Sequence, residues 1–592
     1  MNPLLTPTLM ARLPTGAALP GDAPARGKVS RRKSEIRLKQ MFTDRQQWET
    51  RWKEIRDFQN PWAGIFDDTL DESSPARRRD LRMMDGTPYL AATTAAAGIM
   101  AGLTPPSRPW FRLSLEDKQL ADYVPMRRWL DDVQDLLYSA MSKSNFYNAV
   151  HSVYLELPFG QAPMSIMPHA TMGVTCKPYT IGTYALDVGS DGMVNTFAYK
   201  YKMSLLQLVE KFGLANLPEN LQEEYKKDNV SATKYTVCWL IEPNDDRVPF
   251  QLGAKNMEYR SIYWIEGSSS DEILYAGGFR KFPIPAARWH VLGLMPYGIG
   301  PGWFAEGDAK MLQVQYGDIS DGVSLSVRPP VKATEASLAY GVNMIPGGVT
   351  VVEDAKAAGV DPLYQVQLNI RDASTFAAET RQRIEKYYGA DLFRMFDMMD
   401  KGQMTAREVI ERSQEKLQIL GPVVERMQYE FLSPIVERYF DILSQANTLP
   451  PLPPDLPEAA GQEIKLEYTS PLAQAQKMSG LTAIEQGVSF VATIAQISPD
   501  TVKKVDWMEA ADRYLDMLGV PASMIRPDDV VKEEVAAEQQ QAQQMQQQQM
   551  LLDAAQPVSQ AVKNVTDAAT AGGGVTGNPA MAQWLGLPSG GV

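Results

Sequence analysis

The strongest constraint on the fold is a long amphipathic helix predicted between residues 405 and 440. Thr405 and Glu408 have the spacing of a capping box, in which the threonine hydroxyl accepts the amide three residues on and the glutamate reaches back. Pro422 and Pro434 lie inside the predicted helix, and we expect bends there because proline lacks an amide donor. The apolar residues that recur at helical spacing and define one face are Leu417, Leu420, Val424, Met427, Phe431 and Ile435.

Two further helices are predicted on either side of a short, strand-like segment. The first covers residues 308–327 and starts beside Glu306 and Asp308, because acidic side chains favour a helix N-terminus. The second covers residues 372–388 and ends at Gly389, a residue type common just after helices. This order indicates a helical hairpin that carries a small insert at its tip.

Strands are predicted over much of residues 160–290. The segments 236–241 and 261–265 are β-branched and aromatic and are bounded by Gly, Pro, Asn and Asp, which is typical of strands. One amphipathic helix near residues 205–212 interrupts them, and residues 464–468 form a later strand. We therefore expect an α+β fold.

The N-terminal third is predicted to be helical. Apolar residues at helical spacing over residues 44–58 define one helix face, and residues 90–103 are apolar but rich in small residues, which favours a packed helix. Residues 123–157 also indicate helices. Between these two regions, the prolines of residues 105–112 exclude a continuous helix. The residues of the first face are Trp48, Trp52, Ile55 and Phe58.

The charge balance limits how this chain can handle nucleic acid. Its 592 residues contain 58 Lys+Arg and 71 Asp+Glu, a formal net charge of −13. Such a chain does not wrap DNA by bulk charge, so any contact is loose or depends on a few placed cations. A basic run at residues 26–39 is either the solvated start of a helix or a contact for DNA or a partner.

No catalytic or metal-binding pattern is present in the sequence. The two cysteines and three histidines show neither C-x-x-C nor H-E-x-x-H spacing, and no Walker loop or G-x-S-x-G elbow occurs. The glycines of residues 298–302 are similar to a phosphate loop but lack its spacing, which favours a hinge before a helix. An enzyme using His151 or His290 would need a nucleophile or metal that the sequence does not show. We expect no cofactor, no metal and, without an apolar run of 18 residues, no membrane span.

Several strings resemble the head-to-tail connector (portal) family of short-tailed bacteriophages (podoviruses). Residues 98–113 (GIMAGLTPPSRPWFRL) resemble the most characteristic family string, and the resemblance covers about residues 35–530. One departure is Gln161, which stands where the family usually has a small residue. The other similar strings are Asp85–Pro88, Leu157–Gly160, Met404–Phe440 and Tyr468–Gln476.

The resemblance implies a portal-type fold with a mainly helical stem, wing and crown, a β-rich segment in the wing and a small α/β clip. The predicted parts are a flexible basic arm (1–39), the first part of the wing (40–305), stem helix 1 (306–328), the clip (329–370), stem helix 2 (371–390), a channel loop (391–404), the long kinked helix with the second part of the wing (405–470), a crown (471–530) and a Gln- and Gly-rich tail without expected order (531–592).

The resemblance also implies a function without catalysis. Members form a ring, usually of twelve subunits, at one capsid vertex, and the ring is the channel for DNA packaging and ejection. The implied partners are double-stranded DNA in transit, the terminase large subunit, a tail adaptor, and the major capsid and scaffolding proteins, with no membrane. The protein would assemble in the host cytoplasm and remain in the virion. The alternative is another virion structural protein, such as an internal or ejection protein.

The channel loop supplies the candidate DNA-contacting residues. The resemblance places Arg394, Lys401 and Gln403 in the DNA channel, with Lys401 meeting phosphates. Unbranched methionines make such a loop adaptable, and Gly402 gives the backbone freedom to present the lysine. A lysine is a compact hydrated charge on a flexible stem and suits transient contact. Alternatively, Lys401 is an ordinary solvated loop lysine.

Overall fold

The computed structural model describes residues 31–66, 83–115, 124–226, 233–247, 253, 256–269, 272–327, 331–332, 361–362, 370–390, 420–451 and 464–469, with scattered residues between 487 and 545. The chain divides into two compact units, Met1–Thr482 and Ala483–Val592. In the second unit, the described residues between 487 and 545 are all helical. All that follows concerns the first unit.

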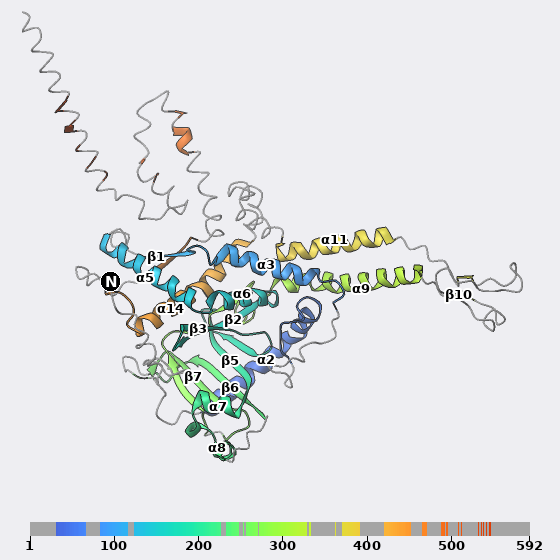
Figure 1. The fold of residues 1–592 in the computed structure, drawn as a ribbon, viewed down its shortest axis with the longest axis horizontal. Coiled ribbons are helices and arrows are strands. Elements are labelled where there is room, and N and C mark those ends of the chain that lie inside the picture. Colours follow the sequence, from blue (N-terminus) through green and yellow to red (C-terminus); the bar gives the residue numbers. More distant parts are fainter. Residues whose placement is uncertain are drawn as a thin grey trace, which may run out of the picture. The chain divides into compact units, whose positions relative to one another are not determined.

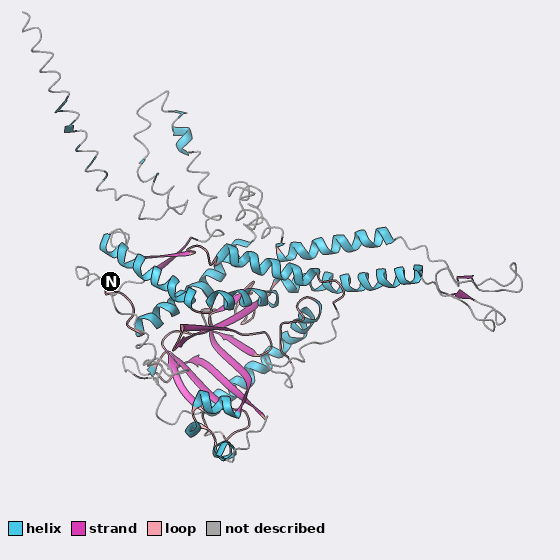
Figure 2. Cartoon of the chain, viewed as in Figure 1, coloured by secondary structure: helices cyan, strands magenta, loops and turns pink. Residues whose placement is uncertain are grey.

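The α+β prediction is confirmed, since helices and antiparallel sheets form separate layers (Figure 2). The larger sheet has the order β4-β5-β6-β7-β8, and a smaller one has the order β3-β2-β9. Their strands are β2 (Gln161–His169), β3 (Gly173–Pro178), β4 (Tyr184–Val188), β5 (Val194–Ser204), β6 (Lys234–Pro243), β7 (Tyr259–Ile265), β8 (Tyr275–Phe279) and β9 (Ala286–Arg288).

Helix α2 (Arg31–Phe58) packs beside the larger sheet. Trp52 and Ile55, from the predicted face, are fully buried. The predicted flexible arm is wrong for residues 31–39, which belong to this helix. The reason is tertiary: the Arg31 side chain is buried and donates hydrogen bonds to the carbonyls of Ser269 and Glu272.

Both faces of the larger sheet are covered in its centre. Strand β6 has six consecutive buried residues, because side chains alternate between two covered faces. One face packs on Leu38 and Met41 of α2, and the other belongs to an aromatic cluster that includes Trp52. At one end of its strands lie α7 (Leu205–Phe212), as predicted, and the helix α8 (Glu219–Lys226), which was not. Single 3₁₀ turns occur at Leu157–Phe159 and Leu214–Asn216.

The helical layer shares a second core. The predicted helices in residues 90–103 and 123–157 are confirmed, as is the strand at residues 464–468, and their apolar faces join one large cluster. Strand β1 pairs antiparallel with β12, from Phe111↔Tyr468 to Leu115↔Ile464. The elements are α3 (Thr87–Leu103), β1 (Phe111–Leu115), α5 (Val124–Lys143), α6 (Phe146–Glu156), α14 (Ser433–Gln445) and β12 (Ile464–Tyr468).

The long helix predicted from Thr405 is described from Leu420 onward. Its apolar face is confirmed there, since Val424, Met427, Phe431 and Ile435 are all buried. A π-helical turn, Gln428–Leu432, precedes α14, whose first turn contains Pro434. Pro434 has no amide hydrogen to donate to the carbonyl four residues back. The widened π-helical turn just before it accommodates this missing hydrogen bond. The capping box lies outside the described residues, and a bend at Pro422 stays a prediction.

The two predicted stem helices are present as α9 (Pro301–Val327) and α11 (Ile370–Tyr388). Helix α11 ends at Gly389, which has a φ of 65°, as predicted. The predicted start of the first helix is wrong, because α9 begins at Pro301. Proline fits a first helical position, where its missing amide would be unsatisfied anyway. The described backbone of the insert is a short antiparallel pair, β10 (Val331–Lys332) with β11 (Asp361–Pro362).

Candidate functional site: a helical hairpin and its junctions

Helices α9 and α11 pack along each other and extend beyond the rest of the body (Figure 1). Ala305, Ala309 and Leu312 of α9 are fully buried, as are Ala377 and Ile384 of α11. Small residues at the contact allow two helix axes to approach closely. The inner half of the hairpin is therefore a packed, rigid base.

A polar network centred on Asp85 fastens the hairpin to α3. The Asp85 carboxylate accepts hydrogen bonds from the amide of Thr87, at 2.8 Å, and from Arg381 of α11, at 2.7 and 2.8 Å. The side-chain oxygen of Gln313 on α9 accepts the amides of Met84, at 2.6 Å, and Asp85, at 2.8 Å. One short loop thus joins three helices.

The electrostatics favour a charged Asp85 in this network. Burial alone would raise the pKa of this carboxyl. Hydrogen bonds from Thr87 and Arg381, together with the positive charge of Arg381, outweigh burial and hold the pKa of Asp85 below its ordinary value. The Asp85–Arg381 pair is therefore an ion pair at neutral pH.

A second polar junction connects the hairpin to α2. Lys310 of α9 contacts Glu54 of α2 at 2.9 Å and Glu306 at 2.7 Å. Burial and a hydrogen bond to Glu54 raise the pKa of Glu306, whereas the hydrogen bond with Glu306 lowers the pKa of Glu54. Of the two carboxyl groups, Glu306 is therefore the first to take up a proton as the pH falls.

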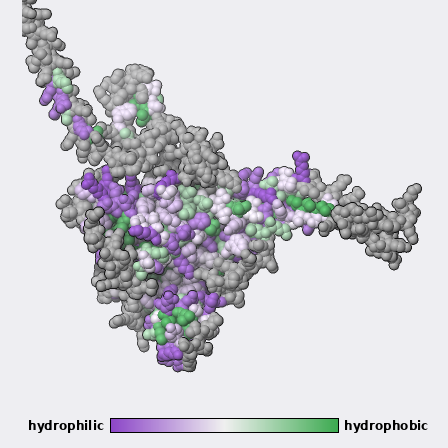
Figure 3. All heavy atoms as spheres, in the orientation of Figure 1, coloured by the Kyte–Doolittle hydropathy of each residue, from purple (hydrophilic) through white to green (hydrophobic). Residues whose placement is uncertain are grey.

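The outer half of the hairpin presents large apolar side chains to solvent. Val314 and Val327 of α9 are 63% and 72% exposed, and Phe376 of α11 is 49% exposed. Val323 and Leu325 add to this surface, which is visible as an apolar area on the hairpin (Figure 3). Apolar groups gathered on a projecting element are typical of a protein–protein contact surface.

The glycine-rich string at residues 298–302 is a packing junction in the structure, not a phosphate loop. A Cβ on Gly300 would lie 2.3 Å from the carbonyl oxygen of Leu157, and one on Gly160 would lie 2.0 Å from that of Gly298. Gly160 also has a φ of 106°, which L side chains rarely adopt. The buried Gln161 accepts the amide of Gly298 at 3.2 Å. Residues 157–160 and 298–302, both singled out in the sequence, therefore contact each other through their backbones.

The predicted DNA-channel residues Arg394, Lys401 and Gln403 lie outside the described residues, so the structure does not place them. Neither cysteine is a reactive thiol near neutral pH. His290 is exposed, and burial raises the pKa of both the Cys176 and Cys238 thiols to about 12. Over the described part of the chain, no group of three or more His, Cys, Asp or Glu could hold a metal ion.

Sequence reasoning missed the buried ion pair between Arg288 of β9 and Glu430 in the π-helical turn. Their side chains approach to 2.7 Å and are 1% and 7% exposed. No local pattern reveals this pair, because 142 positions separate the two residues. Asp85 could have been found, since it belongs to one of the quoted strings, although its partner Arg381 could not.

A projecting hairpin with exposed apolar residues, joined to an α+β body by polar junctions, is typical of proteins that act through contacts with other macromolecules. None of the described helices is long and apolar enough to cross a membrane. A family model for the bacteriophage head to tail connecting protein matches residues 31–525, close to the predicted 35–530. This chain belongs to that family.

Two relatives support the assignment. The chain is similar to the portal protein of Salmonella phage epsilon15, with 34% identity over 84% of this chain and 88% of the relative. It is also similar to the probable portal protein of Bordetella phage BPP-1, with 33% identity over 83% and 88%. A chain from the neck of an empty GTA particle computed with C6 symmetry aligns at 10% identity over 68% of this chain and 86% of that chain, with a TM-score of 0.30, which is too low to support an argument.

Proposed function

We propose that this protein is the portal of a short-tailed phage and forms a ring at one capsid vertex through which DNA is packaged and ejected. The observation that carries the proposal is the match to portal proteins over 84% of this chain and 88% of the relative. In this proposal the body is the wing, α9 and α11 are the stem, and residues 329–370 are the clip. The protein acts as a structural channel, and the terminase, a separate protein, hydrolyses ATP.

The exposed outer half of the hairpin supports assembly into a ring. Val314, Val323 and Val327 would be buried against neighbouring subunits, which removes apolar surface from water. The net charge of −13 per subunit suits a channel in which DNA slides. A strongly basic lining would instead hold the DNA, because each phosphate that it neutralised would add counterion-release affinity. Charges further apart than about 10 Å are largely screened at ordinary salt.

Imaging tests the proposal directly. The purified protein should form closed rings, usually of twelve subunits, in negative-stain electron micrographs, without added nucleotide or metal. An internal or ejection protein would give no closed ring with a central channel. A uniform population of monomers across a wide concentration range, or rings that EDTA disperses, would count against the proposal.

We expect the clip to dock the terminase and the tail adaptor. Charge-reversing substitutions within residues 333–360 should leave ring formation unchanged and abolish binding to terminase or adaptor, because in the sequence this insert is a separate segment between α9 and α11, whose own residues form the hairpin's packed base. Pull-down of each partner with preformed rings measures the effect. Loss of the ring itself would show that these residues belong to the assembly interface instead.

We expect Lys401 to contact DNA in transit. Lys401→Ala should leave the ring intact and lower the amount of packaged genome that particles retain several-fold, because a ring of lysines adds transient phosphate contacts that one lysine cannot provide. Genome retention is measured by gel analysis of DNA from purified particles. Lys401→Arg keeps the charge and should retain DNA like the parent. If Lys401→Ala also retains full-length genome, Lys401 is an ordinary solvated lysine.

A further inference from the structure

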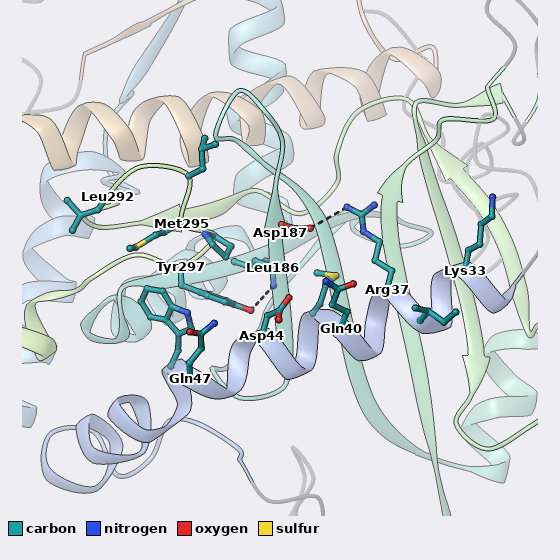
Figure 4. Close-up of a pocket in the computed structure, with 15 residues that line it drawn as sticks. Lys33, Arg37, Gln40, Asp44, Gln47, Leu186, Asp187, Leu292, Met295 and Tyr297 are labelled. Carbon is teal, nitrogen blue, oxygen red and sulfur yellow. Dashed lines mark hydrogen bonds and ion pairs between the residues drawn. The ribbon is translucent and has the colours of Figure 1, made fainter.

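A groove of about 980 Å³ runs along the first half of α2 (Figure 4). Its floor is one face of the helix, which includes Ile36, Gln40 and Asp44 at helical spacing. Its opposite wall is the loop between β9 and α9, where Leu292 and Leu294 lie. Ile36, Leu292 and Leu294 are 58%, 61% and 64% exposed. The groove therefore offers apolar surface from two segments that are far apart in the sequence.

The charges in the groove are unequal in their pairing. Arg37 contacts Asp187 at 3.3 Å and Glu242 at 3.8 Å. Lys33 and Asp44, at different positions along the groove, make no hydrogen bond or ion pair with any other residue that the structure describes. An extended apolar peptide whose single positive charge lies at the Asp44 end of the groove would complement this surface, because it would cover the leucines and pair with the carboxylate without placing a cation beside Lys33.

The segment that precedes α2 has this composition. Arg12 is the one charged side chain of residues 1–21, and it is surrounded by Leu4, Leu5, Leu9, Met10 and Leu13. We propose that residues 4–13 lie in the groove of their own subunit, with Arg12 paired to Asp44. This inference goes beyond the proposed function and does not depend on it.

The chain length allows this arrangement. Thirteen residues of helix separate Arg31 from Asp44, a distance of about 20 Å at 1.5 Å per residue. Nineteen residues separate Arg12 from Arg31, and a chain of that length without secondary structure has a root-mean-square span of roughly 24 Å. Because effective concentration is greatest when the span of a tether matches the separation of the sites, the intramolecular contact is favoured.

The two kinds of contact have different roles. Covering Ile36, Leu292 and Leu294 supplies the driving force, since these side chains are otherwise in water. An exposed ion pair such as Arg12–Asp44 contributes little affinity, but it selects which residues of the segment face the groove. The segment thus shields an apolar surface from non-specific association.

Cysteine labelling tests the proposal in the full-length protein. A cysteine at Gln40→Cys, inside the groove, should react with a maleimide roughly tenfold more slowly in the full chain than in a variant that lacks residues 2–20, as expected when the segment occupies the groove about nine-tenths of the time. A cysteine at the exposed Gln46→Cys, which does not line the groove, should react equally in both. The native Cys176 and Cys238 are 2% and 1% exposed and provide an internal baseline.

A charge exchange tests the pairing without a deletion. Arg12→Glu should accelerate labelling at position 40, and Arg12→Glu combined with Asp44→Arg should restore protection. Equal labelling with and without residues 2–20 overturns the proposal. Protection that arises only in assembled rings and persists without residues 2–20 would show that a second copy covers the groove, and it overturns the proposal as well.

Discussion

Replacing Glu430 with alanine should lower the free energy of unfolding of the first unit by about 3–5 kcal/mol, the usual effect of breaking a buried ion pair. The loss would leave the positive charge of Arg288 uncompensated in a site where its side chain is 1% exposed. Arg288 also donates to the carbonyls of Met295, at 3.0 Å, and Gly192, at 2.7 Å, so the arginine cannot easily swing into water. Urea denaturation followed by tryptophan fluorescence measures the change.

The matched control is Glu437, in a neighbouring part of the same helical segment. It pairs with Lys281, but the two side chains are 48% and 55% exposed. Because water and salt screen such a pair, Glu437→Ala should change the free energy of unfolding by about 1 kcal/mol or less. Equal losses for Glu430→Ala and Glu437→Ala would contradict the importance of burial at the first site.

Replacing Gly300 with alanine should cost about 3 kcal/mol or more of the free energy of unfolding, at the upper end for overpacking a filled site. The new Cβ would lie 2.3 Å from the carbonyl oxygen of Leu157 and 2.5 Å from that of Pro158. Neither atom belongs to a flexible side chain, so relief would require the backbone of one segment to move. The same denaturation experiment reports the effect.

Gly307 in α9 is the control for this substitution. No atom lies within 4 Å of the position that its Cβ would take. Gly307→Ala should therefore be neutral or stabilise the protein by up to about 1 kcal/mol, since alanine is the better helix former. If Gly300→Ala were as stable as Gly307→Ala, the backbone-to-backbone junction would have no energetic role.

Most helices of the described chain could be predicted from the sequence, because periodicity is a local property. For the strands, the sequence predicted a strand-rich region at residues 160–290 and three individual strands, β6, β7 and β12. The spacing of Trp52 and Ile55 predicted the buried face of α2, and the β-branched run around Trp239 predicted β6. The errors are the helix α8, which was not predicted, and the ends of other elements. Helix α9 starts at Pro301 and not near residue 308. Helix α2 already includes Arg31, because the Arg31 side chain donates a hydrogen bond to the carbonyl of Ser269, far away in the sequence.

The candidate site was predictable in part. The order of the quoted strings indicated the connector family, which the family match and the relatives confirm. The strings themselves did not reveal what their residues do. Asp85 ties three helices together, and the glycines at residues 298–302 pack against residues 157–160. The DNA-channel assignment of Lys401 stays a prediction.

The sequence by itself determined the element types, the amphipathic faces, the hairpin with its insert and the family. Only the tertiary structure decided which distant segments meet: β1 with β12, Arg288 with Glu430, and the loop at Leu292 with α2. The physical reason is that periodicity depends on neighbours within a few positions, whereas a long-range contact depends on how the whole chain turns. Residues hundreds of positions apart leave no trace of their pairing in the local pattern.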